Sequence, residues 1–310
     1  MTVLLLDPIF KLHAPGPGHP ECPERYDAVT AALSHLDDFP RIALRDATPD
    51  ELALCHSRRY ISMAEREVRD GLDELSTGDT HVCHQSYDVA VRAVGSVLNA
   101  VDSVMERESS NAFCAVRPPG HHATPSRGMG FCIFNNVAIA ARYAQREYGA
   151  DRVMIADWDV HHGNGTQDIF YEDGSVFFFS THQSPWYPGT GEQSERGEGK
   201  GEGSTLNLPL PAGSGRAEIL GGFQEQLMNA AKSFRPDLVL ISAGFDSRLG
   251  DPLGQFRLTD EDFRDLTEVM MEIADTYAGG RLVSLLEGGY SLSGLAAGVS
   301  AHVRALAGIT

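Results

Sequence analysis

Short apolar runs alternate along the chain with segments of helical periodicity, and this alternation constrains the fold most strongly. Six runs have the length and composition of buried strands: 2–6 (TVLLL), 112–116 (AFCAV), 152–156 (RVMIA), 176–180 (VFFFS), 237–243 (DLVLISA) and 281–286 (RLVSLL). Between them, 218–234 and 260–277 repeat apolar residues at the spacing of one helix face. The pattern predicts a three-layer αβα fold with a mainly parallel sheet.

The domain organisation and the charge narrow the class of protein further. No internal repeat and no Pro- or Ser-rich linker divides the chain, so we expect residues 1–310 to form a single domain. Acidic residues outnumber basic ones 43 to 25, which gives a formal net charge of -18. Such a charge repels nucleic acid and anionic membranes and suits cationic ligands, so we expect no nucleic-acid partner.

The N-terminal segment and the cysteines bear on the compartment. The apolar run at the start of the chain is interrupted by Asp7 and Pro8 and has no basic region before it, which favours a first strand over a signal peptide. No segment has the length of a transmembrane helix. The five cysteines form no CxxC motif. We therefore expect a cytoplasmic protein that does not bind or span a membrane.

Aspartate and histidine residues follow the ends of several predicted strands. In an α/β fold, ligands bind at the edge of the sheet formed by the carboxyl ends of the strands. The segment 155–165 (IADWDVHHGNG) places Asp157, Asp159 and His161 two residues apart. Because side chains alternate along a strand, we expect all three on one face. Asp246 ends another strand-like run, LVLISAGFD, and supplies a third ligand beside Asp159 and His161. Three protein ligands and a water would make an open zinc site, although this donor set also suits iron, cobalt or manganese.

A purely structural role for Asp159 and His161, as hydrogen-bond partners of loop backbones, is the simpler alternative. A second cluster of polar residues favours a catalytic role instead. His121 and His122 follow the strand-like run 112–116 through the rigid segment RPPG. Adjacent histidines suit proton transfer beside a metal-activated water. The combination favours metal-assisted hydrolysis.

Six motifs in order resemble one known family. They are RPPGHHA, GFCIFNN, DWDVHHGNGT, WYPGTG, AGFDSRLGDP and EGGY, and the likeness extends from HPECPER at 19–25 to the last predicted helix. The set resembles the zinc-dependent histone deacetylase family, with its acetylpolyamine amidohydrolase relatives. RPPGHHA, Asn164 and EGGY are more similar to class II and bacterial members than to class I. The resemblance implies the arginase/deacetylase-like fold and deacetylation of amides.

The resemblance also implies which residues hold the metal and move protons. One zinc ion would be ligated by Asp159, His161 and Asp246, the three residues that the strand spacing also indicates. His122 would act first as general base and then as general acid. His121, paired with Asp157, would stay cationic.

Two further catalytic roles are implied. Asn164 would orient His122, and the hydroxyl of Tyr290 would donate to the oxyanion. A monovalent cation site, with potassium as a structural ion, would be formed by Asp157 and Ser180 with nearby backbone carbonyls, including those of Asp159, His161 and Thr181.

The substrate contacts implied by the resemblance describe a narrow slot. Phe131 and Tyr187 match the aromatic walls of a tunnel for an extended aliphatic chain, which suits a lysine side chain, and Gly130 would contribute backbone. Arg25 is similar to the arginine at the floor near the acetate exit. Asp79 is a candidate for the rim residue that binds substrate backbone.

Leu253 bears on the choice of substrate. It occupies the position at which polyamine-specific relatives have a glutamate, so the resemblance favours acetyl-lysine in proteins or peptides. Acetylated polyamines or other cationic small acyl-amides remain the alternative, and a catalytically silent acyl-lysine binding module is disfavoured because the ligands, both histidines and the tyrosine are all present. The sequence contains no G-x-S-x-G motif and no P-loop. The oligomeric state stays open, a homo-oligomer included.

Overall fold

The computed structural model describes residues 1–36 and 38–309, and within these residues seven strands form one wholly parallel sheet. The strands are β1 (Thr2–Leu5), β2 (Asn111–Cys114), β3 (Val153–Asp157), β4 (Val176–Gln183), β5 (Thr205–Leu210), β6 (Leu238–Ala243) and β7 (Leu282–Leu286). Their order across the sheet is β1-β2-β7-β6-β3-β4-β5. The predicted fold class is confirmed: each of the six strand-like runs overlaps a strand, and β5 is an additional one.

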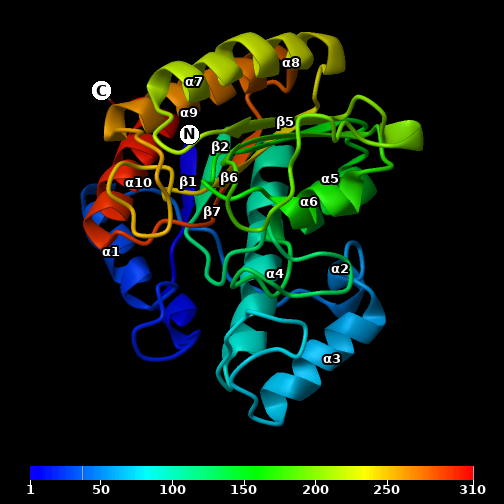
Figure 1. Cartoon of the computed structure of the whole chain (residues 1–310), viewed down its shortest axis with the longest axis vertical. Helices are drawn as coiled ribbons and strands as arrows, with labels where there is room; N and C mark the ends of the chain where they lie inside the picture. Colours follow the sequence, from blue (N-terminus) through cyan, green and yellow to red (C-terminus); the bar gives the residue numbers. More distant parts are fainter. Residues whose placement is uncertain (37, 310) are drawn as a thin grey trace.

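Helices cover both faces of the sheet and complete the three layers (Figure 1). One face packs against α4 (Ser86–Met105), α5 (Asn136–Tyr148) and α6 (Asn164–Phe170), and its apolar cluster extends to α2 (Pro49–Leu52) and α3 (Arg58–Arg69), which contact α5 and α4. The other packs against α1 (Glu24–Ala32), α7 (Arg216–Gly221), α8 (Met228–Phe234), α9 (Asp260–Tyr277) and α10 (Leu292–Leu306). Short 3₁₀ turns occur at Pro8–Leu12, Ser34–Leu36 and Gly199–Gly201. No helix in the described part of the chain is long and apolar enough to cross a membrane.

The side chains of β3 show how the sheet separates its two apolar layers. Val153 and Ile155 belong to the cluster under α4 and α5, whereas Met154 and Ala156 belong to the cluster under α9 and α10. Because both faces are covered, consecutive residues of β3 from Val153 to Ala156 are apolar instead of alternating with polar residues. Because of this burial on both faces, the strands can be predicted from their runs of apolar residues.

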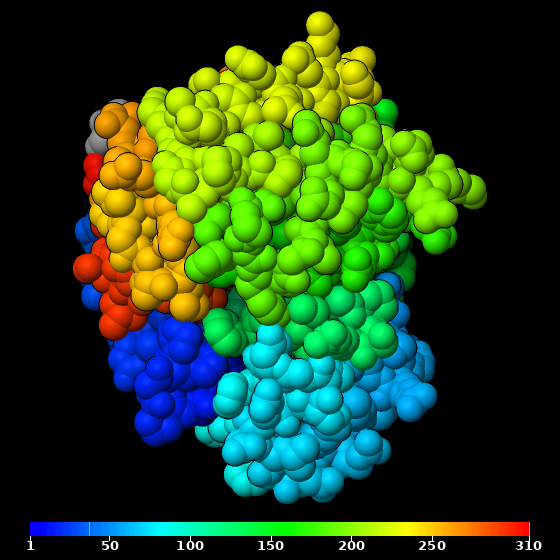
Figure 2. All heavy atoms as spheres, in the orientation of Figure 1, coloured from blue at the N-terminus to red at the C-terminus, as the bar shows by residue number. Residues whose placement is uncertain are grey.

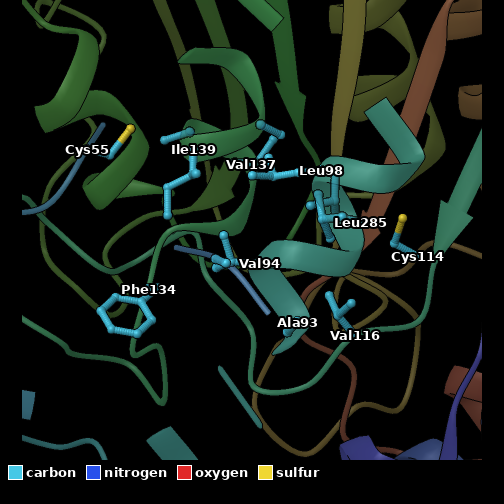
Figure 3. Packing of buried hydrophobic residues seen from close by; sticks show 14 of the residues in the cluster. Cys55, Ala93, Val94, Leu98, Cys114, Val116, Phe134, Val137, Ile139 and Leu285 are labelled. Carbon is cyan, nitrogen blue, oxygen red and sulfur yellow. The ribbon is translucent and has the colours of Figure 1, made fainter. Parts of the chain in front are cut away.

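The central helix α4 anchors one apolar layer. Its Val94 and Leu98 are fully buried and lie close to Leu285 of β7 and to Val137 and Ile139 of α5 (Figure 3). Side chains from a helix, a strand and a second helix therefore fill one space. The packing fixes the sheet beneath the loops that carry the polar clusters.

The predicted helix over 218–234 differs from the structure in its middle. A π-helical turn, Gly222–Leu227, separates α7 from α8. Gly222 lies so close to Leu208 of β5 that a Cβ would collide with the leucine side chain. The wider turn keeps Phe223 and Leu227 buried on the sheet side, so the apolar spacing predicted the buried face correctly and a regular helix wrongly.

Candidate active site

The polar clusters meet at one edge of the sheet, beyond the carboxyl ends of four neighbouring strands. In spatial order these strands are β2, β7, β6 and β3. The loop after β2 carries His121 and His122, the loop after β3 carries Asp159 and His161, Asp246 follows β6, and Tyr290 follows β7. Residues far apart in the sequence therefore converge, as expected for this class of sheet.

Asp159, His161 and Asp246 form the group in the described part of the chain that could hold a metal ion. Their candidate ligand atoms all lie within 4.8 Å of one another. Nδ1 of His161 is 2.9 Å from Oδ1 of Asp159 and 3.2 Å from Oδ2 of Asp246. All three side chains are buried. This geometry matches the ligand set that the spacing predicts.

The surroundings of these three residues fit a divalent cation. Oδ2 of Asp246 is buried and accepts no hydrogen bond of good geometry within the described residues. At Gly288 a Cβ would collide with the carboxylates of Asp159 and Asp246, so this backbone must be glycine for the two acids to approach it. Burial and the charge of Asp159 raise the pKa of Asp246 to about 7. Two buried carboxylates this close call for a compensating positive charge.

Asp159 also makes the backbone contacts that the structural alternative requires. Its Oδ1 accepts the N–H of His161 at 2.9 Å, and its Oδ2 accepts the N–H of Gly288 at 2.8 Å. The N–H of Val160 donates to Oδ1 of Asp246 at 2.9 Å. Such bonds fix the direction of the remaining lone pairs, so the structural role orients ligands and does not compete with metal binding.

The two adjacent histidines differ in their partners. Nδ1 of His121 lies 2.9 Å from Oδ2 of Asp157, and Nδ1 of His122 lies 2.8 Å from Oδ1 of Asn164. Burial alone would lower the pKa of His121, but Asp157 and Asp159 outweigh it and hold that pKa well above its usual value. Burial, with the positive charge of His121, holds the pKa of His122 well below its usual value.

These differences divide the possible roles of the pair. An amide oxygen only accepts, so the contact with Asn164 requires a proton on Nδ1 of His122 and leaves Nε2 of the neutral ring free to accept another. His121 keeps its proton and its positive charge. His122 is thus suited to be a base and His121 to stabilise negative charge.

A cavity of about 260 Å³ reaches these residues. It is lined by Asp79, His122, Gly130, Phe131, His161, Trp186, Tyr187, Leu253 and Tyr290. The face shown in Figure 2 brings together the segments that contribute to it, from the region near residue 75 (cyan) to the loops near residue 185 (green). Its lining is mainly aromatic and aliphatic above a polar base, so it suits a narrow apolar chain that carries a polar end.

Two residues of the cavity wall have left-handed backbone. Gly130 has a φ of +57°, and a Cβ there would collide with the ring of His122. Phe131 has a φ of 68°, which is uncommon for an aromatic residue. The N–H of Gly130 donates to Oδ1 of Asp79 at 2.9 Å, so one oxygen of the predicted rim acid is used to hold this wall.

Leu253 and Arg25 occupy different positions relative to the cavity. Leu253 lines it, and its carbonyl accepts Nε1–H of Trp186 at 2.8 Å. Arg25 is fully buried outside the cavity lining, with its guanidinium 5.1 Å from the centre of the Tyr290 ring. It donates to the carbonyls of Gly289 at 2.7 Å and Glu287 at 2.5 Å. The structure thus places Arg25 behind Tyr290, and a substrate contact by this residue stays a prediction.

The residues predicted for the monovalent cation include two at the ends of neighbouring strands. Asp157 of β3 and Ser180 of β4 are paired in register, and both are fully buried. Thr181 is the next residue of β4, so its side chain projects from the opposite face of the sheet, and its buried hydroxyl is not directed toward Asp157 and Ser180. The strand register thus brings Asp157 and Ser180 side by side, and a monovalent cation at these residues stays a prediction.

Sequence reasoning missed three residues that support the site. Trp186 lines the cavity. Asp251 accepts the backbone N–H groups of Tyr290 at 2.7 Å and Ser291 at 3.0 Å. Glu287 is fully buried beside the histidine pair. All three lie within motifs that the resemblance uses, but their partners depend on tertiary contacts that no spacing reveals.

Comparisons with known proteins agree with this geometry. Residues 19–306 match the family model of the histone deacetylase domain. The chain is 43% identical over 309 residues to histone deacetylase 10, chloroplastic, of Oryza sativa subsp. japonica, covering 94% of this chain and 70% of that protein. It is 40% identical over 307 residues to polyamine deacetylase HDAC10 of Homo sapiens, covering 93% of this chain and 45% of that protein.

A solved structure gives the same result. The crystal structure of the HDA15 HD domain superposes with a TM-score of 0.94 at 36% sequence identity, covering 100% of this chain and 90% of that one. The similarity therefore includes the sheet, both helical layers and the loops that carry the site. The chain belongs to the histone deacetylase family.

Proposed function

We propose that this protein is a zinc-dependent deacetylase that hydrolyses the acetylated ε-amine of lysine in proteins or peptides. The observation that carries the proposal is the juxtaposition of an Asp-His-Asp donor set with a neutral histidine at the base of a narrow apolar cavity. An acetyl-lysine side chain has the matching shape, an aliphatic chain that ends in a polar amide.

Zinc, held by Asp159, His161 and Asp246, would supply Lewis acidity to the amide carbonyl and to water. Nε2 of His122 accepts a proton from the attacking water, since Asn164 keeps its Nδ1 protonated. The same nitrogen then returns a proton to the amine as the C–N bond breaks, which balances the proton transfer.

Two other groups stabilise the charge that develops on the carbonyl oxygen. The hydroxyl of Tyr290 donates a hydrogen bond to it. His121, held cationic by Asp157, stabilises negative charge beside His122. Potassium at Asp157, Ser180 and the neighbouring carbonyls would have a structural role, because it offsets a second buried acid close to the metal ligands.

Acetylated polyamines are the second candidate substrate. The similarity to a human relative named a polyamine deacetylase and the net charge of -18 both favour a cationic small acyl-amide. Leucine at position 253 favours the peptide, because it leaves the cavity wall without a carboxylate that would attract a distal ammonium group.

The experiment is a panel of acetyl-lysine peptides, acetylated polyamines and longer acyl-lysine peptides, assayed after metal analysis with and without a chelator. We expect acetate release from the peptides, its loss with chelator and its return on adding zinc. Turnover of polyamines alone would replace the substrate and leave the mechanism intact. Undiminished hydrolysis by metal-free protein would overturn the mechanism.

A further inference from the structure

Glu287 is a buried acid that the mechanism above does not use. It follows directly after β7 and has no exposed surface. Its backbone is fixed, since its N–H donates to the carbonyl of Ala243 at 3.0 Å and its carbonyl accepts from Arg25. The position of the carboxylate is therefore set by the end of the strand.

The two oxygens of Glu287 contact different neighbouring segments. Oε2 accepts the N–H groups of Gly120 at 2.7 Å and of His121 at 3.1 Å. Oε1 accepts the hydroxyl of Ser242 in β6 at 3.1 Å. Because β7 lies between β2 and β6 in the sheet, the side chain connects the loop after β2 to the strand that leads to Asp246.

The contacts of Glu287 fix the position of the backbone at His121 and His122, whereas the contacts of the imidazole rings fix only the orientation of the rings. Asp157 and Asn164 orient the imidazoles of His121 and His122 through their Nδ1 atoms. Glu287 fixes the backbone from which both rings project. Since a base works only within hydrogen-bond reach of its proton, a small shift of this backbone would misplace Nε2 of His122.

We propose, on the basis of the proposed function, that Glu287 is a positioning residue that sets the distance between the His121–His122 pair and the Asp159–His161–Asp246 donor set. Its side chain is long enough to accept hydrogen bonds from the amides of Gly120 and His121 and from the hydroxyl of Ser242 at the same time. Its negative charge is not the property required.

Two substitutions separate reach from charge. Glu287→Asp keeps the charge but is one methylene too short to contact both sides. Glu287→Gln keeps the length: its oxygen accepts the N–H groups of Gly120 and His121, and its amide donates to the hydroxyl oxygen of Ser242.

With an acetyl-lysine peptide as substrate and zinc content measured for each protein, we expect Glu287→Asp to lower kcat about tenfold or more with KM within about twofold. Glu287→Gln restores kcat to within about threefold of the wild type. The proposal fails if Glu287→Asp keeps full kcat, or if Glu287→Gln loses as much as Glu287→Asp.

Hydrogen exchange of the Gly120 and His121 amides gives a second readout that needs no turnover. Both amides exchange faster in metal-free Glu287→Asp than in metal-free wild type, and at the wild-type rate in Glu287→Gln. Equal protection in all three proteins overturns the inference. An inactive wild type with this exchange pattern overturns the proposed function and leaves the positioning role standing.

A buried glutamate elsewhere provides the matched control. Glu51 accepts the N–H of Thr48 at 2.7 Å at the start of α2, outside the site. Glu51→Asp disturbs a similar contact and lowers stability without changing kcat. A loss of kcat in this variant equal to that in Glu287→Asp would attribute the effect to general destabilisation and overturn the positioning role.

Discussion

Tyr290 and Leu253 line the same cavity but differ in chemistry. Tyr290 offers a hydroxyl, and its ring is held between the guanidinium of Arg25 and the ring of Phe131, whose centre is 5.9 Å away. Leu253 offers only apolar surface, on a loop that Asp251 and Trp186 hold. The first residue should therefore control rate, and the second should control which substrate is accepted.

Replacing Tyr290 with phenylalanine should lower kcat by about 10²–10³ while zinc content stays unchanged, because only an oxyanion donor is lost. Phenylalanine keeps the ring contacts with Arg25 and Phe131. Steady-state kinetics together with metal analysis measures both quantities. As a contrast, Asp246→Ala should lose metal and activity together, and a Tyr290→Phe enzyme with full turnover would rule out the hydroxyl.

Replacing Leu253 with glutamate should shift the ratio of kcat/KM for acetylated polyamine over acetyl-lysine peptide about tenfold or more toward the polyamine, since a carboxylate attracts a distal ammonium. The matched control is Leu249→Glu, because Leu249 is exposed in the same loop and lies outside the cavity lining. The same shift in both variants would indicate a general charge effect.

The candidate ligand residues could be predicted from the sequence because the alternation of β3 continues beyond its last residue: Trp158 and Val160 are buried on one side, which leaves Asp159 and His161 on the other. Asp246 could be predicted for a similar reason, since it ends another apolar run. Glu287 also follows a strand, but its importance depends on Gly120 and Ser242, which only the strand order brings beside it. Partners set by tertiary neighbours leave no periodic signal in the sequence.

At the level of elements, burial decides what the sequence reveals. The central strands could be predicted because both faces are covered, which makes most of their positions apolar. The π-helical turn at Gly222–Leu227 could not, because its apolar spacing is that of a regular helix and the close contact of Gly222 with Leu208 arises only in the folded chain. The spacing of apolar residues predicts which face is buried, whereas close backbone packing decides the local helix geometry.

Helix α4 illustrates how one element supports the sheet. Leu98 is fully buried in the apolar layer that includes Leu285 of β7 (Figure 3). We expect Leu98→Ala to lower the free energy of unfolding by about 2–5 kcal/mol through lost contacts and a residual cavity. Urea denaturation measures the change. Because Leu98 lies outside the site, kcat at a temperature where the variant is folded should equal that of the wild type.

At the level of the whole molecule, one buried histidine makes folding sensitive to acid. His302 of α10 is within hydrogen-bond distance of Thr267 of α9, at 2.6 Å, and of Ser284 of β7, at 2.8 Å. It also packs edge-on against Trp158. Burial lowers the pKa of His302 to about 3 from 6.5. The neutral ring thus belongs to the folded state.

Between pH 6.5 and about 3 the unfolded chain binds a proton at His302 that the folded chain does not, so this residue makes stability fall as the pH falls through that window. From pH 7 to pH 5 the contribution is about 2 kcal/mol. His302→Gln should be less stable at pH 7 but lose about that much less on acidification, as measured by urea denaturation at both pH values. An equal loss in the two proteins would contradict the assignment.

The two edge strands of the sheet, β1 and β5, affect whether copies of this chain can associate by strand pairing. Pro209 lies in β5 and has no N–H to offer a strand from another molecule, and the residues flanking Arg41 hydrogen-bond to Leu4 of β1. Such features oppose the joining of sheets edge to edge, the step that begins many ordered aggregates. At high concentration we therefore expect self-association to proceed through helical surfaces and loops, and the central sheet to remain a closed unit of one chain.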